Sequence, residues 1–216
     1  MKAPVRLISC LAIAAALAGC SREGELVLQQ GVGITAVRTT CPAVGIPDYT
    51  GNITVFRNPA SRAASDIDVV ASMTNLRSTC DDTSERVYTN ATFDVLARRT
   101  DVRGNRRVEL PYFSTVVRGS NSVVTKRIGT VVLDFADGQE RARASAQAGA
   151  FVDRAEATLP AEIREKITRR RKPGDPDAAL DPLADPEVRA ALNRASFELL
   201  VGFQLTEPQL AYNATR

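Results

Sequence analysis

Extended apolar stretches dominate the middle of the chain and predict strands. They cover residues 52–56, 67–74, 87–100, 108–117, 123–136, 139–148 and 196–205. In several of them apolar and polar residues alternate, which is typical of strands that bury one face. Within 139–148 alanines take every second position and polar residues the others, so we expect the alanines to face inward. The pattern predicts a mainly β fold, an antiparallel β-sandwich.

Glycine-containing turn signals separate these stretches. Gly104 and Gly119 each lie near an asparagine between two extended stretches, and Asp137-Gly138 lies between two more. An Asp-Gly pair flanked by strands is the strongest short-range signal for a hairpin, so we expect those two strands to pair. Pro111 predicts an edge position or a bulge for its strand, because proline lacks the N–H that a ladder needs.

A helical pattern interrupts the strands near the C-terminus. Leu159, Ile163 and Ile167 recur every four residues, and Pro160 suits a first helical turn. A linker rich in Pro and Asp follows, and a second short helix is expected from residue 185. We therefore expect one domain over residues 33–216, with a two-helix insertion at about 157–195 before the last strand.

The first twenty residues have a pattern of their own. Lys2 and Arg6 precede an apolar run from Leu7 to Leu17, which ends in Leu-Ala-Gly-Cys20. Eleven residues at ~1.5 Å each cannot cross a ~30 Å hydrocarbon layer. The run therefore predicts a cleaved signal over residues 1–19.

Leu-Ala-Gly-Cys resembles the lipobox of bacterial lipoprotein precursors. The resemblance implies that the Cys20 thiol is the lipid attachment site, that signal peptidase II cuts before it, and that residues 20–32 are a lipidated tether. Because Ser21 is not aspartate, it also implies the outer membrane, at its periplasmic side. An ordinary secretory signal with a chance cysteine is the alternative. Residues 50–150 are similar to extracytoplasmic modules of the Ig/fibronectin-III-like kind, which adds only a fold class.

Two cysteines remain after this processing, Cys41 and Cys80. Exported chains meet an oxidising compartment, so we expect the two to form a disulfide that closes a loop of about 40 residues. One buried and one reactive thiol are the alternative.

Composition narrows the chemistry. The 216 residues include 28 Lys+Arg, 25 Asp+Glu and no histidine. A Ser-His-Asp or Cys-His nucleophile and a His-ligated zinc are therefore excluded. We expect no cofactor, no metal and no catalytic constellation. A net charge of +3 also gives no reason to expect a nucleic-acid partner.

Two arginine-rich clusters are candidate contact surfaces. The cluster Arg169, Arg170, Arg171 and Lys172 could contact anionic groups or a partner protein, or could simply complement the dipole at a helix C-terminus. A second group flanks a predicted turn and could form a basic patch or merely keep the turn soluble: Arg98, Arg99, Arg103, Arg106 and Arg107.

These observations lead to three functional hypotheses. The first is a membrane-anchored, non-catalytic binding or scaffold module whose partner is an envelope protein or an anionic polymer. The second is an accessory subunit of an outer-membrane or secretion assembly that docks through Arg169–Lys172. The third is a periplasmic hydrolase that uses only carboxylates, which needs no histidine.

Overall fold

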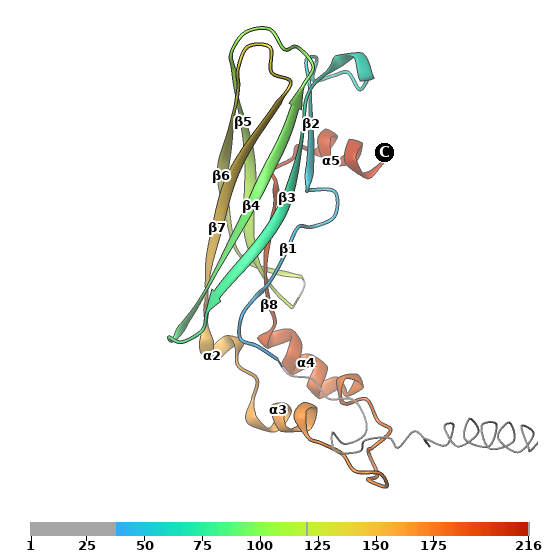
Figure 1. Ribbon diagram of the computed structural model, residues 1–216. Coiled ribbons are helices and arrows are strands. Elements are labelled where there is room, and N and C mark those ends of the chain that lie inside the picture. The colour runs from blue at the N-terminus through green and yellow to red at the C-terminus, as the bar shows by residue number, and fades with distance from the viewer. Residues whose placement is uncertain (1–37, 120, 216) are drawn as a thin grey trace, which may run out of the picture.

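A computed structural model describes residues 38–119 and 121–215. It confirms the predicted fold class, because eight strands form two four-stranded sheets with short helices before the last strand (Figure 1). The strands are β1 (Ala43–Gly45), β2 (Asn52–Phe56), β3 (Ile67–Asp81), β4 (Arg86–Arg99), β5 (Arg106–Arg118), β6 (Ser122–Phe135), β7 (Arg141–Asp153) and β8 (Phe197–Phe203). The helices are α2 (Arg154–Ala157), α3 (Ala161–Thr168), α4 (Pro186–Ala195) and α5 (Glu207–Ala214), with short 3-10 turns η2 (Ala64–Asp66) and η3 (Pro182–Ala184).

The eight strands are divided equally between two sheets. The first sheet has the order β1-β8-β5-β6 and the second sheet has the order β2-β3-β4-β7. Among the described strand pairs, β1 and β8 run parallel and the others run antiparallel. Strands β6 and β7 are therefore both edge strands, one in each sheet.

The predicted hairpin at Asp137-Gly138 is wrong. Gly138 has a φ of 76°, as a turn glycine can have, but β6 pairs with β5 and β7 pairs with β4. The turn therefore carries the chain from the first sheet to the second. The β4–β5 connection at Gly104 crosses between the sheets in the same way, whereas the turn at Gly119 does form the β5–β6 hairpin.

The edge position predicted from Pro111 is also wrong, since β5 lies between β8 and β6. The Pro111 carbonyl accepts from the N–H of Gln204, so the proline nitrogen faces the β8 side as well. There β8 has already ended, because its last residue, Phe203, pairs with Tyr112. The missing N–H therefore removes no rung of a ladder, and the bulge in β5 lies at Val116/Val117 instead.

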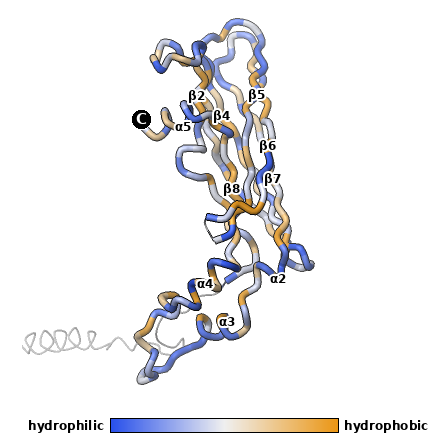
Figure 2. Tube along the Cα trace, turned by 180° about the vertical axis from the view of Figure 1, so that it is seen from behind, coloured by the Kyte–Doolittle hydropathy of each residue, from blue (hydrophilic) through white to orange (hydrophobic). Residues whose placement is uncertain are grey.

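The main core lies between the sheets. Figure 2 shows apolar residues along the strands and polar residues at the loops that join them. The largest buried apolar side chains include Phe93, Phe135 and Phe203. The alanines of β7 face this core as predicted, and Ala148 and Ala150 are buried in it.

The helices form a second apolar cluster at one end of the sandwich (Figure 1). Its buried residues are Ile163, Ile167, Val188, Ala191 and Leu192. Helix α5 was not predicted. It lies beside β2, where Asn213 donates to the carbonyls of Tyr49 (2.7 Å) and Asn52 (2.8 Å).

Candidate functional site

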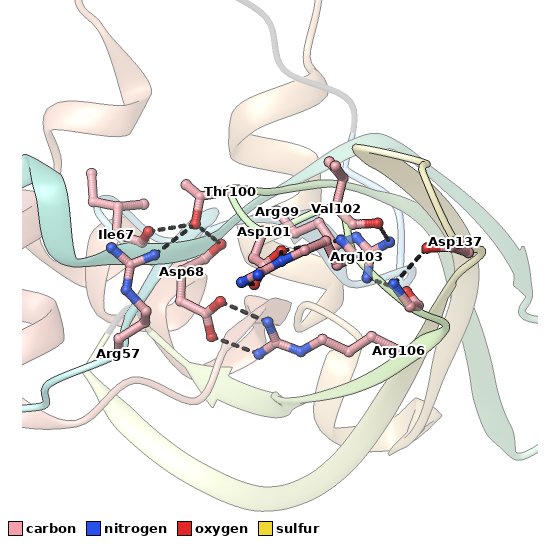
Figure 3. A network of polar contacts seen from close by, with 11 residues as sticks. Arg57, Ile67, Asp68, Arg99, Thr100, Asp101, Val102, Arg103, Arg106 and Asp137 are labelled. Carbon is pink, nitrogen blue, oxygen red and sulfur yellow. Dashed lines mark hydrogen bonds and ion pairs between the residues drawn. The ribbon is translucent and has the colours of Figure 1, made fainter.

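Arg99 is buried at the loop end of the sandwich, opposite the helices. It lies at the end of β4, and its side chain is fully buried beside the Phe135 ring. The guanidinium donates to four backbone carbonyls, those of Val102 (2.6 Å), Gly104 (2.9 Å), Ala136 (2.8 Å) and Gln139 (2.8 Å). Val102 and Gly104 belong to the loop between β4 and β5, and Ala136 and Gln139 to the loop between β6 and β7; Figure 3 shows Arg99 beside Val102. Arg99 therefore holds together the two loops that cross between the sheets, and its buried guanidinium presents no charge to a ligand.

The arginines around Arg99 are each next to a carboxylate. Arg106 makes two hydrogen bonds of 2.6 Å with Asp68, and these bonds hold the pKa of Asp68 below its usual value (Figure 3). Arg103 holds the pKa of Asp101 far below the usual value by a similar fork. The remaining pairs of this group are Arg98 with Glu140 and Arg107 with Glu109. Arg99 and Arg106 therefore hold the loop end together, and the exposed Arg98, Arg103 and Arg107 are each paired with a carboxylate, so the five do not form a joint basic patch.

A second buried carboxylate lies on the outer side of the second sheet. Asp94 of β4 accepts from Ser145 (2.6 Å), Asn75 (2.8 Å) and Arg143 (2.6 Å), and these hydrogen bonds lower its pKa. Asn75 has a φ of 53° and lies in the irregularity of β3 between Thr74 and Arg77. Asp94 therefore stabilises a strand irregularity, and its charge is neutralised by Arg143.

The four residues of the candidate contact cluster, Arg169–Lys172, lie in different environments. Arg171 is buried, and it donates to Asp177 (3.1 Å) and to the carbonyl of Lys166 (3.2 Å). Arg169 is exposed and also pairs with Asp177, whose pKa this contact lowers. Arg170 and Lys172 are exposed. Two of the four cations thus hold the loop after α3, and two face solvent.

The predicted disulfide is present. Cys41, two residues before β1, is bonded to Cys80 near the end of β3, with Cα atoms 6.1 Å apart. The bond joins the chain segment that leads into the first sheet to a strand of the second. Cys20 and the tether lie outside the described residues.

An opening lies along the seam where the edge strands β6 and β7 face each other. Tyr112 of β5 crosses this seam, and its hydroxyl donates to the carbonyl of Gln147 in β7 (2.8 Å). Beyond that contact, toward the helices, a pocket of about 240 Å³ opens. We call this pocket the seam pocket. It is lined by Arg86, Ser114, Val116, Val124, Thr125, Arg127, Gly149, Ala150, Phe151 and Leu199.

The seam pocket combines apolar and cationic groups. Val124 and Phe151 are 54% and 53% exposed, so the lining presents apolar side chains to solvent. Arg86 stacks over the Phe151 ring at 4.7 Å, and Arg127 reaches the pocket from β6. No carboxylate lines this pocket among the described residues. The sequence did not point to it, because residues 86, 127 and 151 are distant along the chain and meet only through the sheet order.

Comparison with protein-family models, curated proteins and solved structures finds no match for this chain. Within residues 38–119 and 121–215, no helix is long and apolar enough to cross a membrane. In the same residues no group of three acidic or cysteine side chains could hold a metal ion.

Proposed function

We propose that the protein is a lipid-anchored lipoprotein of the cell envelope that acts as a non-catalytic binding or scaffold module. The single observation that carries this proposal is Leu-Ala-Gly-Cys20 at the end of a short apolar signal. Two or three acyl chains on Cys20 would anchor the chain firmly, since each buried CH₂ contributes ~0.8 kcal/mol. The proposed location is the periplasmic face of the outer membrane.

The arrangement of the described residues supports such a module. Residue 38, where the described chain begins, lines a groove beside Leu183 and Leu192 of the helical cluster. The Cys41–Cys80 disulfide fixes this segment to the sandwich at the same end. A tether attached there would leave the long faces of both sheets and the loop end around Arg99 available to a partner.

Metabolic labelling with palmitate tests the anchor. Label is expected in the wild type and not in Cys20→Ala, while both are exported. Membrane fractionation tests the location, and labelled wild type found only in the inner membrane would contradict the outer-membrane part. In-cell photo-crosslinking tests the binding role. Turnover of a substrate by purified protein that crosslinks to nothing would overturn it.

The second candidate is an accessory subunit that docks through the helical end. It is favoured by the exposure of Arg170 and Lys172 on a loop that Arg171 and Asp177 hold in place. The informative variant replaces only Arg170 and Lys172 with Ser, because replacing buried Arg171 would also disturb the fold. Loss of complex formation with an unchanged melting temperature is the expected result for this candidate. An intact complex would contradict it.

The carboxylate-based hydrolase draws no support from the described residues. Such an enzyme needs a carboxylic acid with a raised pKa near a second carboxylate. The buried carboxylates Asp68 and Asp94 both have lowered pKa values and both pair with arginine.

A further inference from the structure

We propose that the seam between β6 and β7 binds an extended peptide segment of a partner protein, which adds as a strand to the edge of β7 and carries apolar and acidic residues in alternation. This inference gives the class of partner that the proposed binding module would recognise. It rests on the proposed function because it assumes that the partner is a protein. It is carried by three features of the seam: the backbone edge of β7, the apolar floor of the pocket, and two arginines, Arg86 and Arg127, that make no ion pair within the described residues.

The backbone of β7 shows which groups face the seam. The Gln147 carbonyl accepts from Tyr112 of the other sheet, so it points away from β4. In an antiparallel strand both polar groups of a residue point the same way, and this direction alternates along the chain. Gly149 and Phe151 therefore also direct N–H and C=O to the seam, while Ala148 and Ala150 pair with β4. Glu140 agrees with this alternation: like Ala148 and Ala150 it has an even number, and its carbonyl points to β4, where it accepts from the Arg99 N–H.

The edge at Gly149 and Phe151 is open to a further strand. In the described structure β7 has β4 as its only ladder partner, and β6 is paired only with β5. Tyr112 closes the seam at Gln147, so the open length runs from there to Asp153 at the end of β7. At ~3.3 Å per residue, this length accepts about six residues of a peptide. Unpaired strand edges are the usual place for such strand addition.

The side chains along the seam determine what kind of peptide fits. An added strand would point every second side chain inward, toward Val116, Ala150 and Leu199, which form the apolar part of the pocket. The intervening side chains would point outward, toward Arg86 and Phe151. Neither Arg86 nor Arg127 has an ion pair within the part of the chain that the structure describes. Carboxylates on the outward positions would neutralise Arg86, and Arg127, which leaves β6 on the side that faces the other sheet, adds positive charge to the same pocket.

The same charges argue against a second copy of this chain as the occupant. Two copies joined at this seam would bring Arg86 and Arg127 of one next to those of the other, and Lys126 lies on the same edge strand. Cations along an edge strand disfavour self-pairing of this kind. An acidic strand from a different protein has the complementary charge.

The test uses the full-length chain in a non-ionic detergent and an acetylated peptide of three Val-Glu repeats. Hydrogen exchange followed by NMR should show slower exchange at the amides of Gly149 and Phe151 when the peptide is present. The amides of Ala148 and Ala150, already paired with β4, should not change. A peptide in which every residue is N-methylated should produce no protection, because it cannot form a ladder. Equal binding of that peptide would overturn strand addition.

Charge is tested separately by titration. A Val-Lys peptide of the same length should bind at least about tenfold more weakly than the Val-Glu peptide, and Arg86→Glu combined with Arg127→Glu should weaken the Val-Glu peptide by a similar factor. Arg164→Glu, on the exposed side of α3, is the control for a charge change away from the seam. Equal affinities for the two peptides would contradict the charge argument. Self-association of the chain that the peptide abolishes would identify a second copy as the occupant and overturn the proposal.

A photo-crosslinker at Val124 in cells separates this inference from the proposed function. Capture of an envelope protein at Val124, lost on the double arginine substitution, supports both. Capture only from the helical or loop ends would leave the binding module intact and exclude the seam. Protection of Gly149 in vitro without any crosslinked partner in cells would support the seam and contradict the binding role.

Discussion

Tyr112 of the first sheet donates its hydroxyl to the carbonyl of Gln147 in the second sheet, at 2.8 Å. The ring that reaches across lies directly over Gly129 of the neighbouring strand β6. A Cβ at Gly129 would lie 2.5 Å from the Cζ atom of Tyr112. The absence of a side chain at Gly129 therefore gives the tyrosine the space it needs to close this part of the seam.

The first prediction concerns this pair. Gly129→Ala should lower the free energy of unfolding by about 1–3 kcal/mol, because the ring must move and give up its hydrogen bond. Tyr112→Phe, which keeps the ring, should cost only about 1 kcal/mol. Urea denaturation measures both. A Gly129→Ala effect that is just as large in a Tyr112→Ala background would show that the ring is not the cause.

The second prediction concerns the buried guanidinium. Arg99→Met keeps much of the volume but removes four hydrogen bonds to crossing-loop carbonyls, of which those of Val102 and Ala136 retain a backbone donor, so we expect a loss of about 3 kcal/mol. Arg98→Met is the matched control, because the Arg98 side chain is 68% exposed and pairs with exposed Glu140. Exposed pairs of this kind contribute at most about 1 kcal/mol. Equal melting temperatures for the two variants would contradict the role given to Arg99.

The third prediction concerns pH. The Asp68 pKa is lowered in the folded protein, so Asp68 contributes stability above its unfolded pKa and loses it as pH falls through the folded value. Asp68→Asn should therefore be less stable than the wild type near neutral pH, by about 1 kcal/mol because Arg106 is partly exposed. The difference should shrink as pH falls below about 4. A difference that stays constant down to pH 2 would show that lost packing, and not charge, is responsible.

The fourth prediction concerns the disulfide. The bond closes 39 residues of sequence, which corresponds to roughly 4 kcal/mol in the chain-entropy model. Cys41→Ser with Cys80→Ser should therefore lower the melting temperature clearly, and a reductant should lower that of the wild type but not that of the double variant. Mass spectrometry of unreduced protein with both cysteines alkylated would contradict the bond itself.

Much of the strand layout could be predicted from the sequence, because alternation depends only on which side chains are buried. The helices around Ile163 and Val188 were predicted for the same reason. The pairing of strands was less predictable. Asp137-Gly138 permits a tight turn, but whether its flanking strands pair depends on the long-range choice of β7 for β4 and on the loop carbonyls held by Arg99.

The arginines show the same limit for the candidate sites. In the sequence Arg98 and Arg99 are neighbours with equal charge, yet alternation places one outside and the other in the core. Arg169 to Lys172 likewise look equivalent until Asp177 is brought next to Arg169 and Arg171. Helix α5 did carry a local signal, because Thr206 and Gln209 form a capping box. The seam pocket carried none, since it depends on sheet order.

The disulfide also has a mechanical consequence. Any pull on the chain from the side of residue 38 reaches Cys41 before it reaches β1, whose three residues make a short parallel pairing with β8. Through Cys80 the load passes instead to β3, a strand of 15 residues that pairs with β4 from Val69 to Asp81 and with β2 from Ile67 to Ser72. The bond thus diverts tension from a strand held by a three-residue pairing to one held by a long ladder that must be sheared along its length.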